Sequence, residues 1–329
     1  MDHRIFSNRI FNVESETDFE KLALELFRFQ YDALKPYRNY CQLLKIDPEK
    51  VISVTDIPFL PIDFFRTQRI SCFEKSAKLV FSSSGTTGSN TSFHEIPYPE
   101  IYEQSFKRGF HHFYGNIEDY CILALLPSYL ERKGSSLVYM TEHLIRASKH
   151  RDSGFYLHDL EALSRKLKTL KEKNQKTLLL GVTYALLDLA AAFPIHFPEL
   201  IVMETGGMKG KRREMIREEL HETLKQAFGC QTIHSEYGMT ELLSQAYSKG
   251  NGLFETPPWM RVFIRNTNDP LTLVNNGQSG GINVIDLANN CSCAFIAVQD
   301  LGRKHSDGSF EVLGRFDSSL ARGCNQMVL

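Results

Sequence analysis

Up to about residue 258, short apolar runs alternate with segments of helical periodicity, which is the pattern of strands and helices in an α/β chain. The runs expected to be strands are residues 78–81, 120–126, 177–182, 199–203 and 231–234. The segments expected to be helices are residues 17–34, 157–173 and 209–228. Residues 177–182 leave the choice open, because a short buried run also fits the start of a helix.

Local signals predict where some of these elements begin and end. Thr17 can cap the first helix, with Glu20 three residues further on. Gly229 is expected to close the helix over 209–228 in the left-handed conformation. Residues 51–65 contain Pro58 and Pro61, so they are expected to form a loop with short helical turns.

The pattern changes beyond residue 258, where short apolar runs are separated by Asn, Gly and Asp turns. The expected strands there are residues 259–264, 281–287, 294–299 and 309–313. The sequence thus predicts a βα-alternating body followed by a mostly β end, without internal repeats.

Composition and charge narrow the class of protein. The chain has 329 residues, of which 42% are hydrophobic, and its net charge is -1, so it can bury a large core and has no basic excess for nucleic acid. Seven cysteines, an odd number, suit no small disulfide scaffold, which favours a reducing cytoplasm. We expect no signal peptide and no membrane span, because the most apolar stretch is shorter than the roughly 20 residues needed.

The first candidate for chemistry is the Ser/Thr/Gly loop at 82–88, which directly follows a predicted strand. Such a loop leaves backbone N–H groups free to surround an anion, and its hydroxyls can donate to phosphate oxygens. It lacks the Lys of a Walker loop. Taken alone, it could equally be a polar surface loop between core elements.

Four further segments accompany predicted strands along the chain. They are Gly206 with Gly207, residues 237–241, residues 300–303 after the strand over 294–299, and residues 314–317. In order and spacing, these segments and the 82–88 loop resemble the signature of the adenylate-forming superfamily of acyl- and aryl-CoA synthetases, peptide-synthetase adenylation domains and firefly luciferase. The resemblance extends from about residue 79 to residue 323.

The resemblance implies an α/β adenylate-forming large domain over 1–316, with a β-rich subdomain from about residue 258 and a hinge remnant or tail at 317–329. It implies activation of a carboxylic acid with ATP and Mg²⁺ to give acyl-AMP. The residues that would hold the β- and γ-phosphates are Ser83, Ser84, Gly85, Thr86, Thr87 and Gly88. The other implied contacts are Thr240 to the α-phosphate, Glu241 to Mg²⁺, Gly206, Gly207, Tyr237 and Gly238 around adenine, and Asp300 and Arg315 to the ribose.

Two departures from the superfamily narrow the resemblance. The loop does not continue into a Pro-Lys pair, and the chain stops twelve residues after Asp317, so the small mobile domain is expected to be absent. Residues 126–132, 134–137 and 322–324 resemble the acyl-protein synthetases, the family of the long-chain fatty acid–luciferin-component ligase, whereas the first hundred residues match only in general character. This resemblance implies acyl transfer to Cys324 and then to a partner such as a reductase or carrier protein.

Each assignment has a simpler alternative. Tyr237 could be a core residue, Glu241 a solvated cap, Asp300 a turn residue and Cys324 an ordinary tail cysteine. The 127–137 segment could line the acyl pocket or only lead into a helix at Ser135.

Other residues fit no site of their own. Cys291 and Cys293 form a C-x-C pair without a second pair for zinc, so they are expected in a strand or turn. His111 and His112 have no clear partners, and His234 fits either the acyl pocket or the core.

Rival functions also remain open at this point. One is an acyl- or aryl-CoA ligase that takes its small domain from another chain, and another is a non-catalytic nucleotide-binding protein. A serine hydrolase is disfavoured because no Gly-x-Ser-x-Gly elbow occurs. NAD and flavin are not expected, because no Gly-x-Gly-x-x-Gly βαβ unit occurs.

Overall fold

The structure is a computed structural model that describes residue 6 and residues 9–74, 77–83, 91–127, 132–206 and 215–316. The chain forms two compact units. The central unit is Phe73–Pro257, and the terminal unit combines the chain up to Cys72 with the chain from Pro258 onward. The β-rich end therefore folds together with the amino-terminal segment.

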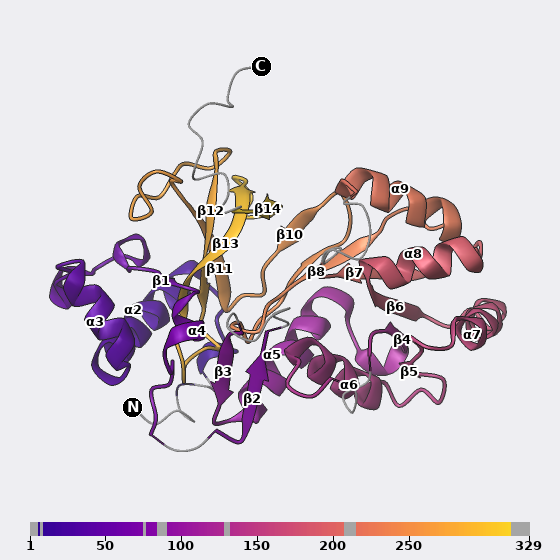
Figure 1. Ribbon diagram of the computed structural model, residues 1–329, viewed down its shortest axis with the longest axis horizontal. Coiled ribbons are helices and arrows are strands. Elements are labelled where there is room, and N and C mark those ends of the chain that lie inside the picture. The colour runs from indigo at the N-terminus through magenta and orange to yellow at the C-terminus, as the bar shows by residue number, and fades with distance from the viewer. Residues whose placement is uncertain are drawn as a thin grey trace. The chain divides into compact units, whose positions relative to one another are not determined.

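The central unit is built on a mixed sheet with strand order β10-β9-β8-β7-β6-β4-β5 (Figure 1). Strands β5, β4, β6, β7 and β8 are parallel, whereas β9 and β10 are antiparallel. The strands are β4 Cys121–Leu125, β5 Gly154–Phe155, β6 Thr177–Val182, β7 Ile201–Thr205, β8 His234–Tyr237, β9 Ala246–Ser248 and β10 Leu253–Glu255. Residues 177–182 are thus a strand, and helix α8 follows directly.

Helices cover both faces of this sheet, with α8 and α9 on one face and α5 and α6 on the other (Figure 1). They are α5 Pro99–Tyr114, α6 Ser136–Ser148, α7 Leu160–Glu172, α8 Thr183–Ala192 and α9 Arg217–Phe228, with the 3₁₀ turn η3 at Ile117–Asp119. Leu123, Leu179 and Val202 of the sheet share one buried cluster with Leu167 of α7 and Leu224 of α9. Burying each such side chain contributes about 2 kcal/mol, so this cluster is the core that positions the strand ends.

Gly229 closes α9 as the sequence predicted. It has a φ of 69° and its N–H donates to the carbonyl of Lys225 at 2.8 Å. A Cβ there would lie 2.1 Å from the ring of His196, so only glycine fits. The predicted start at Lys209 is not supported, because Met215 and Ile216 are not helical and α9 begins at Arg217.

The strand predicted at 231–234 lies further along the chain. Strand β8 begins at His234 and includes Tyr237, because Met203↔His234 and Thr205↔Glu236 pair with β7. Gln231 and Thr232 are exposed and are not part of the strand. As a result, Tyr237 is the last residue of β8 and does not follow the strand.

A separate antiparallel hairpin, β2 Leu79–Ser82 and β3 Phe93–Ile96, completes the central unit. It confirms the strand predicted before the Ser/Thr/Gly loop. Its two strands flank that loop in the sequence.

The terminal unit has an antiparallel sheet of order β11-β12-β13-β14, with β1 pairing in parallel with β13. The strands are β1 Leu60–Pro61, β11 Met260–Arg265, β12 Ser279–Asp286, β13 Phe295–Lys304 and β14 Phe310–Arg315. The helices are α2 Glu16–Ala33, α3 Lys35–Leu43 and α4 Phe64–Thr67, with 3₁₀ turns η1 Pro48–Lys50 and η2 Val54–Asp56. The predicted β-rich end and the short turns within 51–65 are confirmed.

Two boundaries in the terminal unit differ from prediction. The cap of α2 is Ser15, whose hydroxyl accepts from Asp18 N–H at 3.1 Å, and not Thr17. Strand β13 continues past residue 299, because Asp300 pairs with Arg315 of β14. Asp300 therefore lies inside a strand.

Within the described ranges, no helix is both long and apolar enough to cross a bilayer.

Candidate functional site

The hairpin β2–β3 forms the base of the Ser/Thr/Gly loop. Ser83 N–H donates to the Ser92 carbonyl at 3.1 Å, and Ser92 N–H donates to Ser83 Oγ at 2.9 Å. The predicted phosphate ligands Ser84, Gly85, Thr86, Thr87 and Gly88 lie outside the described residues. Ser83 thus stabilises the base of the loop by accepting from Ser92 N–H, and its hydroxyl proton can still donate to a phosphate oxygen.

The parallel strands β7 and β8 end side by side and carry two of the predicted segments. Gly206, directly after β7, is exposed and has a φ of 58°, a left-handed conformation that suits glycine. Its predicted companion Gly207 lies outside the described residues. Tyr237 ends β8, and Gly238 follows it. The carboxyl ends of parallel strands are where α/β sheets bind ligands.

A buried hydrogen bond joins these two strand ends. Thr205 Oγ1 donates to Glu236 Oε2 at 2.5 Å, and both side chains are buried. Burial raises the pKa of Glu236 to about 7, with Glu204 adding to the rise and Thr205 opposing it. No sequence pattern marked Glu236 as a site residue, because its partner Thr205 lies 31 residues away.

A second buried link reaches the predicted α-phosphate residue. His94 of β3, 1% exposed, places Nδ1 2.8 Å from the carbonyl oxygen of Thr240. Burial lowers the pKa of His94 to about 4, so the ring is neutral at pH 7 and Nδ1 carries the proton donated to that carbonyl. The strand that leaves the Ser/Thr/Gly loop is therefore bonded to the 237–241 segment.

Tyr237 and Glu241 are both buried in the central unit. The Tyr237 ring meets Phe254 edge to face with 5.9 Å between centroids. Glu241 is 5% exposed, next to a turn in which Leu242 N–H donates to the Met239 carbonyl at 3.1 Å. Their roles at adenine and Mg²⁺ stay predictions.

The two predicted ribose residues lie in the terminal unit, where they face each other across strands. Asp300 and Arg315 are register partners in β13 and β14, and Arg315 Nε lies 3.5 Å from Asp300 Oδ1. The Arg315 side chain is 76% exposed, against 14% for Asp300. Residues separated in sequence thus form one charged pair, of which only the Arg315 side chain is exposed.

The predicted acyl-side segment lies beside the base of the Ser/Thr/Gly loop. Ser82 N–H donates to the Gly134 carbonyl at 2.8 Å. Ser135 caps α6 by accepting from Val138 N–H at 3.4 Å, which confirms the predicted helix entry. Residues 128–131 lie outside the described residues, so the pocket role stays a prediction.

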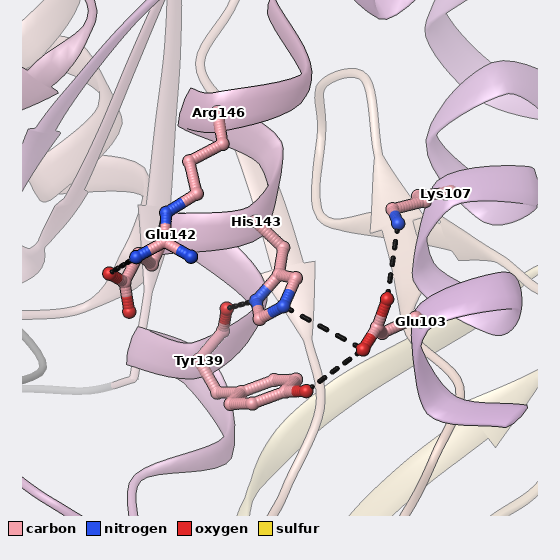
Figure 2. A network of polar contacts seen from close by, with 6 residues as sticks. All are labelled: Glu103, Lys107, Tyr139, Glu142, His143 and Arg146. Atoms are coloured by element: carbon pink, nitrogen blue, oxygen red, sulfur yellow. Dashed lines mark hydrogen bonds and ion pairs between the residues drawn. The ribbon is translucent and has the colours of Figure 1, made fainter. Parts of the chain in front are cut away.

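Helix α6 is tied to α5 by polar contacts around Glu103 (Figure 2). Tyr139 Oη donates to Glu103 at 3.0 Å, Lys107 donates to it at 3.3 Å, and His143 Nε2 lies 3.7 Å away. The Tyr139 ring also contacts Phe81 of β2, with 5.6 Å between centroids. The cluster therefore fixes α6 against the hairpin that leads into the loop.

His234 has a partner that the sequence did not reveal. Its Nδ1 lies 3.2 Å from the Tyr114 hydroxyl of α5. Burial, followed by the nearby Lys249, lowers the pKa of His234 to about 4. His234 is thus a neutral, packed residue near the start of β8.

Among the described cysteines of the terminal unit, Cys41, Cys291 and Cys293 are buried and Cys72 is partly buried. Cys291 and Cys293 lie between β12 and β13, and Cys72 N–H donates to the Cys291 carbonyl at 2.9 Å. Burial raises the pKa of Cys41 to about 12 and also raises that of Cys293. The described residues contain no group of three or more potential metal ligands.

Comparison in sequence points to the acyl-protein synthetases. The family model "Acyl-protein synthetase, LuxE" matches residues 1–96. A long-chain-fatty-acid–luciferin-component ligase of Photorhabdus luminescens is 37% identical over 76 residues, which are 23% of this chain and 65% of that protein. The expectation that the first hundred residues match only in general character is therefore wrong, because the family model matches there.

Comparison in structure points to acyl-CoA ligases. ATP-bound MatB from Rhodopseudomonas palustris superposes with a TM-score of 0.55 at 15% identity, over 74% of this chain and 49% of that one. A 2-hydroxyisobutyryl-CoA ligase with 2-HIB-AMP and CoA superposes with a TM-score of 0.66 at 13% identity, over 93% and 72%. The chain thus matches about half the length of MatB.

At these identities the solved structures establish the fold alone, and the predicted α/β adenylate-forming class is confirmed. The chain has the fold of adenylate-forming acyl-CoA ligases and is similar in sequence to the acyl-protein synthetases over residues 1–96.

Proposed function

We propose that this chain joins a carboxylic acid to the AMP of ATP and then transfers the acyl group to a protein thiol. The proposed acid is a fatty acid. A carboxylate oxygen attacks the α-phosphorus, the bond to the bridging oxygen breaks, and pyrophosphate leaves. A thiolate then attacks the acyl carbon and AMP leaves. Both steps balance without an oxidant or reductant.

The observation that carries the proposal is the convergence of separately predicted segments in the central unit. Gly206 directly follows β7, the 237–241 segment begins at the last residue of the neighbouring parallel strand β8, and Thr205 and Glu236 bond those strands together. His94 bonds the strand that leaves the Ser/Thr/Gly loop to Thr240. Three segments separated in sequence are thus linked by direct contacts, as a shared nucleotide site requires.

The residues suit ATP with Mg²⁺. Mg²⁺ is commonly held by one or two carboxylates, phosphate oxygens and waters, so the single carboxylate of Glu241 is a sufficient protein ligand. When bound, the cation would neutralise phosphate charge during attack by the carboxylate. Thr240 would donate to the α-phosphate, while Ser83 and the 84–88 residues would surround the outer phosphates.

The remaining proposed contacts come from the resemblance and are assigned to each unit separately. Gly206 presents exposed backbone, which allows close approach of a flat base. Tyr237 is the proposed stacking residue, and Asp300 with Arg315 would bind the ribose hydroxyls. The exposed guanidinium of Arg315 is able to bond to a ligand, since its link to Asp300 is a single 3.5 Å contact.

Cys324 is the proposed acyl acceptor, although it lies outside the described residues. The thiolate is the nucleophilic form of cysteine, so a raised pKa suppresses reaction. Burial raises the pKa of Cys121 to about 11 and raises those of Cys72 and Cys230, in addition to Cys41 and Cys293. These cysteines are poor acceptors, which favours Cys324, and the acyl group would pass from it to a partner reductase or carrier protein.

The test combines pyrophosphate release with intact mass. The protein, Mg²⁺-ATP and fatty acids of short, medium and long chain should give acid-dependent pyrophosphate and one acyl adduct. Cys324→Ala should keep pyrophosphate release and lose the adduct, while the matched control Cys72→Ala keeps both.

Other outcomes would overturn parts of the proposal. An adduct that persists in Cys324→Ala would contradict that cysteine as acceptor. Acyl-CoA formation without an adduct would instead support a CoA ligase with an external small domain. No pyrophosphate with any acid would overturn the proposed activity.

A further inference from the structure

A buried carboxyl with no role in the proposed chemistry lies at the carboxyl ends of β7 and β8, which lead into two of the segments proposed to bind ATP. Glu236 is in β8, opposite Thr205 at the end of β7, and is 9% exposed. Its Oε2 accepts the Thr205 hydroxyl at 2.5 Å. The bond crosses between the strand that leads to Gly206 and the strand that leads to the 237–241 segment.

The other oxygen of the same carboxyl lies against the 237–241 segment itself. A Cβ built on Gly238 would lie 2.4 Å from Glu236 Oε1, and 3.3 Å from Cγ of Gln245. The carboxyl therefore fills the space that a side chain at 238 would need. The Glu236 side chain thus contacts Thr205 at the end of β7 and lies against Gly238, which is two residues before Thr240.

The surroundings of this carboxyl favour a neutral, hydrogen-bonded group over an ion pair. The titratable groups that act on it are Glu204 of β7, Tyr114 of α5 and Tyr247 of β9, all of which are acids. A protonated carboxyl can accept from Thr205 and still donate a hydrogen bond of its own. Placing a carboxyl in this position costs desolvation that an apolar side chain would avoid.

We propose that Glu236 is a positioning residue for the nucleotide site, holding the end of β7 and the 237–241 segment in one arrangement. Through Thr205 it sets the position of Gly206, and through Gly238 it sets that of Thr240. The inference rests on the proposed function for its ligand, since the segments it joins are those proposed to bind ATP.

The main test is Thr205→Val, which removes the hydroxyl and keeps the shape of the side chain. The matched control is Thr177→Val, because Thr177 is an equally buried threonine at the start of β6 whose hydroxyl donates to the Gln175 carbonyl at 2.8 Å. Loss of one hydrogen bond of about 1 kcal/mol predicts that Thr205→Val weakens ATP binding about fivefold. Amide hydrogen exchange within 237–241 should also be faster, and Thr177→Val should change neither.

Two variants at Glu236 separate positioning from packing. Glu236→Gln keeps an oxygen for Thr205 and should retain ATP binding, whereas Glu236→Ala should raise the KM for ATP more than it lowers kcat. If Glu236→Ala does not fold, Thr205→Val and Glu236→Gln still decide the question.

The readouts distinguish this inference from the proposed activity. If Thr205→Val leaves both ATP affinity and exchange within 237–241 unchanged, Glu236 has only a packing role and the inference is wrong. If the unmodified protein neither binds ATP nor releases pyrophosphate, faster exchange in Thr205→Val still supports positioning, while the ligase proposal fails.

Discussion

The residues of the candidate site are held differently in the two units. In the central unit, Thr205, Glu236 and His94 are buried, and their bonds run at 2.5 and 2.8 Å. In the terminal unit, Asp300 and Arg315 pair at 3.5 Å, and the Arg315 side chain is 76% exposed while that of Asp300 is 14% exposed. Buried polar groups must find partners, whereas an exposed ion pair contributes about 1 kcal/mol or less.

The buried contacts of the central unit are therefore expected to stabilise the fold as well as the proposed site. Substitutions in the central unit should affect both stability and nucleotide binding. Those at Arg315 should affect binding with little effect on stability. The contrast between stabilising contacts in the central unit and weakly stabilising ones in the terminal unit can be tested by substitution.

The largest effect is expected from His94→Ala. Removing the ring leaves a cavity and a Thr240 carbonyl without its donor, which should lower the free energy of unfolding by about 4 kcal/mol. The measurement is chemical denaturation. His143→Ala is the matched control, because His143 Nδ1 also bonds a main-chain carbonyl, that of Tyr139 at 2.9 Å, but its side chain is 21% exposed. Equal losses in the two variants would contradict the contrast.

The next largest effect is expected in how the free energy of unfolding depends on pH. The folded-state pKa of Glu236, about 7, lies above the ordinary 4.5, so the folded protein keeps a proton that the unfolded chain has lost. This stabilisation is present below pH 4.5 and is lost as the pH rises to 7, by about 3 kcal/mol at most. Glu236→Gln should lack this loss, which denaturation of both proteins at pH 5 and pH 8 would reveal.

His94 acts on stability in the opposite direction. Its folded-state pKa of about 4 lies below the ordinary 6.5, so stability is lost as the pH falls from 6.5 to 4. The comparison at Glu236 must therefore use differences between the two proteins. Parallel pH curves for wild type and Glu236→Gln would show that the Glu236 carboxyl does not titrate in this window.

A smaller effect is expected from Gly238→Ala. The added Cβ would lie 2.4 Å from Glu236 Oε1, and the resulting shift should lower the free energy of unfolding by about 2 kcal/mol. The control is Gly109→Ala in α5, where a Cβ would meet nothing within 4 Å. Because alanine suits a helix better than glycine, that variant should gain about 1 kcal/mol. Thermal unfolding measures both, and an unaffected Gly238→Ala would contradict the close contact.

The smallest effect on stability is expected at Arg315, whose side chain is 76% exposed. Arg315→Ala should change the free energy of unfolding by about 0.5 kcal/mol or less, while weakening ATP binding. Calorimetric titration with ATP, together with denaturation, checks this. Large destabilisation without loss of affinity would reverse the proposed division between the units.

The sequence predicted those features that depend on neighbouring residues. Gly229 closes α9, and the strand before the Ser/Thr/Gly loop ends at Ser82, because local conformation and periodicity decide both. Boundaries set by pairing were misplaced. Strand β8 begins at His234 because it pairs with β7. The cap of α2 was also misplaced, although it is a local contact, because Ser15 and not Thr17 accepts from Asp18 N–H.

The motifs proposed for the site could be read from the sequence, but the contacts between them could not. Gly206 directly follows β7, whereas Tyr237 is the last residue of β8 and Asp300 lies inside β13, so only the order of the motifs along the chain could be read directly. Their supports could not, because Glu236 bonds a residue 31 positions away and His94 one 146 positions away. No local sequence pattern identifies such distant partners. The one available hint is that Glu236 lies next to Tyr237, since a carboxyl beside a residue expected in the core needs a hydrogen-bond partner.

The close approach between Glu236 and Gly238 also restricts how this sequence can change over evolutionary time. A side chain longer than hydrogen at 238 requires a shorter one at 236, and a shorter one at 236 leaves the Thr205 hydroxyl without its acceptor. The three positions should therefore vary together among descendants of this chain. A designer who alters the nucleotide preference should exchange them as a single block.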